Sequence, residues 1–189
     1  MFRDDTNMIE YENNETIIAG NQPISKETLP DDYNTVNELG DCFISLGQYD
    51  NAHICYDKAA VLDPDKANPY IGLGNIALQQ EKLDDALTSF KVAIRLDGDL
   101  SKAYCGIAII FQEYKEYQIA FENYLKCLEI DSDNMTALLG LFQTSCLMGS
   151  FSKVIEYLEL YLQMHLEECS CSLCLATLYM KEGKLRLSR

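Results

Sequence analysis

The sequence repeats itself every 34 residues, and this period restricts the fold more than any other feature. One outline recurs in the stretches 49–65, 83–99 and 117–133, and in a weaker copy that begins at Phe151. Numbered from Tyr33, the repeats are 33–66, 67–100, 101–134 and 135–168, with a partial fifth at 169–189. A fixed period of this length is typical of solenoids, in which each unit packs only on its neighbours.

Small residues return at three positions of each of the first three repeats, and they predict what one unit looks like. At the eighth, twentieth and twenty-seventh positions these are Gly40, Gly74, Ala108; Ala52, Ala86, Ala120; and Ala59, Ala93, Cys127. Small side chains at such spacings let two antiparallel helices approach closely. Turn-forming segments such as "DPD" and "DGD", together with Gly47, Gly149 and Gly183, separate the helices. Each repeat is therefore predicted to be a helical hairpin.

This pattern resembles the tetratricopeptide repeat. The residues that carry the resemblance are "ELGDCF" (38–43), "DNAHICYDKAAVLDP" (50–64), "GLGNIA" (72–77) and "DDALTSFKVAIRLD" (84–97). It covers residues 33–134 well, 135–168 loosely and 169–189 as a fragment. It implies an all-α, right-handed superhelical solenoid of antiparallel helix hairpins, with about four and a half repeats.

The fourth repeat departs from the pattern. Phe142, Val154 and Tyr161 replace all three small residues together. Three coordinated enlargements predict a hairpin that is spread open or re-angled, with a local change in superhelical curvature.

The two ends of the chain differ from the repeats. Residues 1–32 are acidic and lack the period, so we expect a mostly flexible segment ahead of a solenoid over 33–189. The apolar cluster at 16–20 could dock on the first hairpin or in a neighbour's groove. The fifth repeat breaks off after its first helix while Leu173 and Leu175 are still apolar, so this surface belongs to a longer array, frays, or is covered by another chain.

The resemblance also implies where a partner binds, because first helices line the concave groove in this family. Carried over position by position, the candidate groove residues are Asn34, Asn37, Asp41, Asn68, Ile71, Asn75, Gln79, Lys102, Ile109, Gln112, Leu139 and Gln143. Amide side chains offer both a donor and an acceptor, so a ladder of them suits the backbone of an extended peptide. The alternative is that each amide is simply solvated. A carboxylate clamp is not expected, because Asp41 would repel a carboxylate.

Charge and cysteine content exclude several classes of partner and compartment. The formal net charge is −15 and the pI is about 4.4, which argues against nucleic acid and against an anionic membrane surface. The sequence shows no export signal, and its apolar runs are too short for membrane insertion. The eight cysteines are mostly single and sit in helical patterns, so free thiols in a reducing, cytoplasmic compartment are predicted.

Residues that could carry chemistry are few. Cys171 and Cys174 have a CxxC spacing and are weak metal candidates, because one such pair cannot complete a tetrahedral zinc site. His53 and His165 have no acid or nucleophile at a meaningful spacing, and no phosphate-binding loop is present. No catalytic residue and no cofactor are therefore expected.

Together these features predict a non-enzymatic module that binds a peptide or helical segment of a protein partner in its concave groove. Two alternatives stay open from the sequence. The array could be a regulatory or substrate-recruiting arm of an enzyme whose catalytic domain lies outside this chain. It could also be a scaffold that assembles with further copies of itself through the unfinished fifth repeat.

Overall fold

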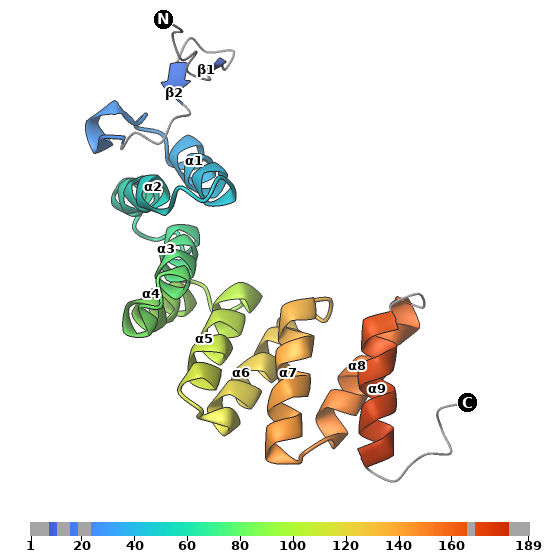
Figure 1. Cartoon of the computed structure of the whole chain (residues 1–189). Helices are drawn as coiled ribbons and strands as arrows, with labels where there is room; N and C mark the ends of the chain where they lie inside the picture. The colour runs from blue at the N-terminus through green and yellow to red at the C-terminus, as the bar shows by residue number, and fades with distance from the viewer. Residues whose placement is uncertain (1–7, 11–15, 19–23, 166–168, 182–189) are drawn as a thin grey trace, which may run out of the picture.

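The computed structural model of the chain describes residues 8–10, 16–18, 24–165 and 169–181. In this part of the chain nine α-helices follow one another as antiparallel hairpins, which confirms the predicted all-α solenoid (Figure 1). The helices are α1 Tyr33–Ser45, α2 Tyr49–Leu62, α3 Asn68–Gln79, α4 Leu83–Leu96, α5 Ser101–Glu113, α6 Tyr117–Ile130, α7 Met135–Met148, α8 Ser152–Met164 and α9 Cys169–Lys181.

Large rings held between glycines bring successive hairpins together. Tyr56 on α2 is buried between Gly40 of its own repeat and Gly72 of the next, and Phe90 on α4 is buried between Gly74 and Gly106. A Cβ atom at Gly40 would lie 2.6 Å from the Tyr56 ring, and one at Gly74 would lie 2.7 Å from the Phe90 ring. Glycine at the eighth position of one repeat and at the sixth position of the next therefore makes room for these two rings.

The turn inside each hairpin needs a left-handed residue at the fifteenth position of the repeat. Gly47 and Gly149 supply it in the first and fourth repeats, with φ of 71° and 72°. Glu81 and Lys115 take the same conformation in the second and third, with φ of 58° and 63°. A side chain with a Cβ atom is strained in this region, so the requirement comes from the hairpin geometry and not from glycine alone. Gly183 lies outside the described residues.

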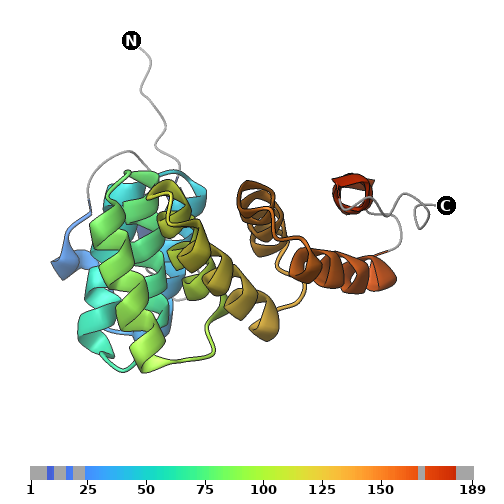
Figure 2. The same ribbon diagram turned by 90° about the horizontal axis from the view of Figure 1, so that it is seen from below.

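The fourth hairpin is spread open, as the sequence predicts. The backbones of α7 and α8 approach each other over a much shorter stretch than those of α1 and α2, α3 and α4, or α5 and α6. Val154 and Tyr161 are buried where the earlier repeats have alanine or cysteine, and Phe142 is half-buried. In Figure 2, α8 and α9 extend away from the stack formed by α1–α6.

The segment just before α1 is anchored on the first hairpin. The backbone N–H of Ile24 donates to Asn51 Oδ1 (3.1 Å), and Lys26 at the start of the 3₁₀ helix Lys26–Thr28 pairs with Asp57 (3.0 Å). Lys58 donates to the Leu29 carbonyl and pairs with Asp31 (2.8 Å). These contacts of residues 24–32 do not follow from the period, because α2 supplies the partners.

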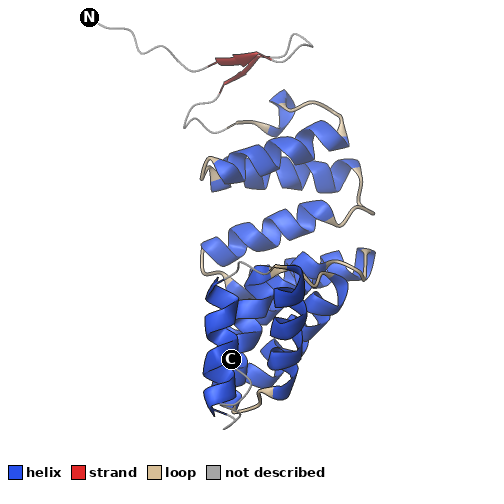
Figure 3. Cartoon of the chain, turned by 90° about the vertical axis from the view of Figure 1, so that its right-hand side faces the viewer, coloured by secondary structure: helices blue, strands red, loops and turns tan. Residues whose placement is uncertain are grey.

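A short hairpin of strands lies further towards the N-terminus (Figure 3). Strand β1, Met8–Glu10, pairs antiparallel with β2, Thr16–Ile18, with Ile9 opposite Ile17. These strands were not predicted from the sequence. They take up part of the apolar cluster at 16–20, whose docking on the array stays a prediction, and Ala19 and Gly20 lie outside the described residues.

The C-terminal end of the array keeps apolar side chains in contact with solvent. Leu173 and Met180 on α9 are 70% and 64% exposed, whereas Leu178 and Tyr179 of the same helix are buried. Among the described residues no helix is long and apolar enough to cross a membrane.

Candidate partner-binding face

The first helices of successive repeats lie next to one another. Close backbone approaches link α1 with α3, α3 with α5, and α5 with α7. All twelve candidate groove residues fall on these four helices. We call the surface that these twelve residues occupy the first-helix face.

Exposure divides these residues into three groups. Seven are exposed, namely Asn34, Asp41, Asn68, Asn75, Gln79, Lys102 and Gln143. Three are half-buried, namely Ile109, Gln112 and Leu139. Two are buried, namely Asn37 and Ile71, and Ile71 packs in the same core cluster as Phe90. The polar members of the set are therefore largely available to a partner, whereas Ile71 has already used most of its surface inside the fold.

The structure joins two of the predicted residues directly. Gln112 on α5 donates from Nε2 to Oε1 of Gln143 on α7 (3.1 Å). A second hydrogen bond orients Gln112, because the Tyr124 hydroxyl on α6 donates to its Oε1 (3.0 Å). Burial raises the pKa of Tyr124, so this hydroxyl keeps its proton at neutral pH. The three side chains form one continuous chain of hydrogen bonds from the core to the surface.

A second tyrosine reaches the first-helix face in repeat one. The hydroxyl of Tyr56 on α2 donates to Asp41 Oδ1 on α1 (2.6 Å). Burial raises the pKa of Tyr56 strongly, and the hydrogen bond to Asp41 raises it further. Neither tyrosine was predicted from the sequence to take part in the site. The signal that could have found their second role is the hydroxyl, since Phe90 occupies the same position of repeat two without one.

Asn37 stands out because it is polar and buried. It is 9% exposed, and its Oδ1 atom is buried without a hydrogen-bond partner. The same fifth position holds Ile71, Cys105 and Leu139 in the next three repeats. A buried amide oxygen without a partner costs about 1–3 kcal/mol, so the apolar residues of the other repeats are the more stable solution.

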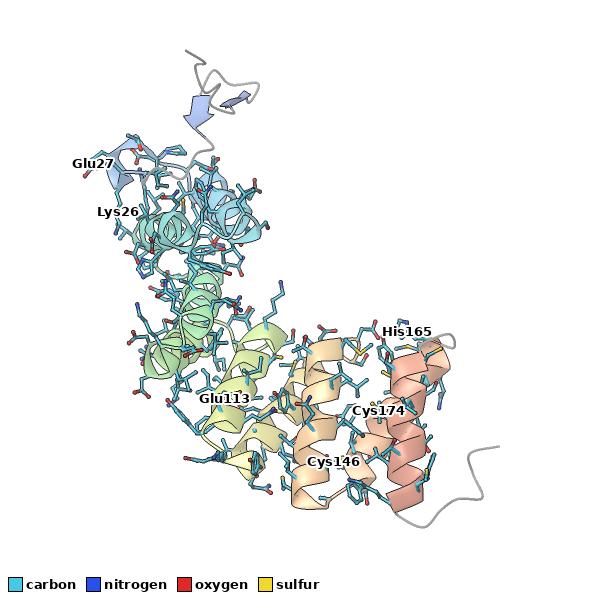
Figure 4. All side chains as sticks on the ribbon, viewed as in Figure 1. Lys26, Glu27, Glu113, Cys146, His165 and Cys174 are labelled. Atoms are coloured by element: carbon cyan, nitrogen blue, oxygen red, sulfur yellow. The ribbon has the colours of Figure 1, made fainter. Side chains whose placement is uncertain are left out.

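The residues singled out for metal or redox chemistry are dispersed. Cys171 is buried, with its Sγ 3.7 Å from Met135 Sδ, and Cys174 on α9 lies near Cys146 on α7 (Figure 4). His165 stacks on Tyr161, with ring centroids 4.3 Å apart, and its Nε2 lies 3.3 Å from Asp133 Oδ1. In the part of the chain that the structure describes, no three or more His, Cys, Asp or Glu side chains gather as metal ligands.

Family models identify the repeats. The model described as TPR repeat matches residues 40–80, and the model described as tetratricopeptide repeat matches residues 101–134, which is the third repeat of the sequence analysis. The chain contains tetratricopeptide repeats. No curated protein matches it significantly in sequence.

Solved tetratricopeptide structures share the fold. A structure from the functional characterization of Pseudomonas aeruginosa pilF superposes with a TM-score of 0.69 at 20% identity, covering 80% of this chain and 69% of the other. YrrB, described as a TPR protein with an unusual peptide-binding site, gives a TM-score of 0.64 at 16% identity, covering 84% of this chain and 81% of the other. The first TPR of Spaghetti (RPAP3), bound to an HSP90 peptide, gives a TM-score of 0.58 at 23% identity, covering 62% of this chain and 94% of the other.

Tetratricopeptide repeats are interaction modules, and some of these neighbours carry or accommodate a peptide. The fold is typical of scaffolds without catalytic residues of their own.

Proposed function

We propose that this tetratricopeptide repeat protein binds an extended or helical segment of a partner protein along its first-helix face. The observation that carries the proposal is a set of exposed side-chain amides on three of the four first helices: Asn34 on α1, Asn68 and Asn75 on α3, and Gln143 on α7. Amides that are spaced along parallel helices can pair with the main chain of a peptide regardless of its sequence.

Apolar contacts supplement the amides. Ile109 and Leu139 are half-buried on α5 and α7, so each keeps part of its side chain for a partner. Burial of such aliphatic surface adds affinity, while the amides fix the path of the peptide. The neighbours that bind peptides support this use of the fold, although their identities of 16% and 23% convey the fold alone.

The test is a peptide selection followed by a comparison of two double variants. Random twelve-residue peptides displayed on phage are selected on residues 1–189, and the selected sequences are synthesised with a fluorescent label. Replacing Asn75 and Gln143 with alanine is expected to weaken binding in fluorescence polarisation by about tenfold, which corresponds to about 1.4 kcal/mol. Circular dichroism should stay unchanged, because both side chains are exposed.

The matched control removes two exposed amides from second helices, Gln118 on α6 and Gln163 on α8. This variant should bind within about twofold of wild type, as is usual for residues outside an interface. An equal loss in both double variants, or no selectable peptide, would overturn the proposal.

A further inference from the structure

The two ends of the first-helix face differ in hydrogen-bonding character, and buried tyrosines set the difference. Tyr124 donates to Gln112 Oε1, which fixes the orientation of that amide, and Gln112 Nε2 then donates to Gln143 Oε1. The Oε1 atom of Gln143 already accepts this bond, and the Nε2 group of the exposed side chain is left to donate to a partner. The end formed by α5 and α7 therefore offers N–H groups.

The end formed by α1 offers acceptors and negative charge. Tyr56 occupies Asp41 Oδ1 and so holds the carboxylate in place, while the second oxygen is left to accept. Asp41 forms no ion pair with any described residue. A carboxylate that is already oriented loses little conformational freedom when it binds a cation.

Two further polar groups lie on the same stripe of α1 as Asp41, at intervals of four residues. Asn37 has its buried Oδ1 without a partner, and Tyr33 has a buried hydroxyl without a partner. Burial raises the pKa of Tyr33, and the negative charges of Asp63 and Asp41 raise it further. One turn of α1 thus combines negative charge with an acceptor that lacks a donor.

We propose that Asp41 and Asn37 form a subsite for a lysine or arginine side chain of the partner, while Gln143 donates to a carbonyl or carboxylate further along the same segment. This inference rests on the proposed function. It adds which side chain of the partner is recognised and in which direction the partner segment lies along the first-helix face. The carboxylate forms a charge-assisted hydrogen bond with the cation. The terminal torsion of an asparagine side chain is soft, so the Asn37 amide can rotate to present its oxygen to the same cation.

The presence of Asn37 at the fifth position, where the next three repeats have apolar residues, agrees with this subsite. Leucine at this position would relieve the unpaired amide and keep the packing that Ile71 and Leu139 provide in neighbouring repeats. A residue that costs stability in the free protein and gains a partner in the complex has the signature of a binding residue.

The experiment uses the phage-selected peptides and the full chain. The selected peptides should be enriched at least twofold in lysine and arginine relative to the unselected library. Asp41→Asn should weaken their binding in fluorescence polarisation by about tenfold, as expected for one charge-assisted contact. Replacing the basic residue of a peptide with norleucine should remove the difference between wild type and the Asp41 variant.

Glu38→Gln is the matched control, because it removes one exposed carboxylate from the same helix. It should change binding by less than about twofold, since a general effect of net charge is screened at physiological salt. Asn37→Leu should raise the midpoint of thermal unfolding and weaken binding of the basic peptides by about threefold, a pair of opposite changes that a purely structural residue would not give.

The outcomes separate this inference from the proposed function. Some peptides could lose affinity for the Asn75 and Gln143 double variant but bind wild type and Asp41→Asn equally. That result would overturn the subsite for a lysine or arginine side chain and leave the proposed function standing. Equal losses in Asp41→Asn and Glu38→Gln would also overturn it. If no peptide depends on the first-helix face, both proposals fall.

Discussion

The second and fourth repeats solve the same packing problem in different ways. In the second, Phe90 is flanked by Gly74 and Gly106, and the two helices of its hairpin run closely together. In the fourth, Leu158 takes the place of the ring, and Phe142 and Cys174 take the places of the two glycines. Other side chains are larger on both helices, with Phe142 on α7 and Val154 and Tyr161 on α8, and the hairpin has opened. The comparison teaches that close helix spacing depends on a large ring that faces small residues on the neighbouring helices, and not on the helical repeat alone.

Removing the ring should have the largest effect. Phe90→Ala leaves a cavity between two glycines that cannot fill it, so we expect a loss of about 3–5 kcal/mol in the free energy of unfolding. Urea unfolding followed by circular dichroism measures this loss. A loss below 1 kcal/mol would mean that the hairpins pack closely for another reason.

Filling the space opposite the ring should cost somewhat less. Gly106→Ala places a Cβ atom against the Phe90 ring and should destabilise the protein by about 1–3 kcal/mol. Adding Phe90→Leu should recover part of that loss, because the smaller side chain is the solution that repeat four adopts. Cys174→Ala, at the sixth position of repeat five, is the control and should cost less than about 1 kcal/mol. A double variant that is no more stable than Gly106→Ala would contradict this pairing of a large ring with small neighbours.

The left-handed turn residues offer a smaller and opposite test. Glu81→Gly and Lys115→Gly should each stabilise the protein by about 1 kcal/mol, because glycine removes the strain of a positive φ. Gly149→Ala should lose a similar amount, since no atom lies within 4 Å of the added methyl group and only the backbone conformation is affected. The midpoint of thermal unfolding reports all three. Destabilisation by both glycine substitutions would show that their side chains outweigh the strain.

The smallest effect is expected from the hydroxyl groups. Tyr124→Phe makes repeat three resemble repeat two, and should cost about 0.5 kcal/mol because half-buried Gln112 can find water in place of the hydroxyl. The more informative measurement is the nuclear magnetic resonance of the Gln112 and Gln143 side-chain amides. Their two proton signals should be well separated in the wild type and should move closer together in the variant. Unchanged spectra would mean that Tyr124 does not orient this pair.

The period and the small residues were enough to predict the hairpins, their order and the opening of repeat four. Small residues recur every 34 residues at the positions of Gly40, Ala52 and Ala59. Each marks a place where two helices pack closely, which is a local contact that the period reveals. The role of glycine at the sixth position was not predicted, because the first and fifth repeats have Glu38 and Cys174 there. Neither end has a further ring to accommodate, which only the structure reveals.

Contacts between distant residues were less predictable. The ion pairs of Lys26 with Asp57 and Lys58 with Asp31 anchor the entry to α1, but the sequence offers many acidic partners for each lysine. For the candidate site, the family pattern places the twelve residues on first helices. It cannot say that Asn37 is buried, or that Tyr56 and Tyr124 orient Asp41 and Gln112, because these facts depend on three-dimensional packing.

Hydrogen exchange on the full chain, with and without a selected peptide, tests the central claim most directly. The account predicts slower exchange in α1, α3, α5 and α7 when the peptide is bound, with little change in α2, α4, α6 and α8. Protection centred on the second helices, or confined to the exposed apolar residues of α9, would contradict it.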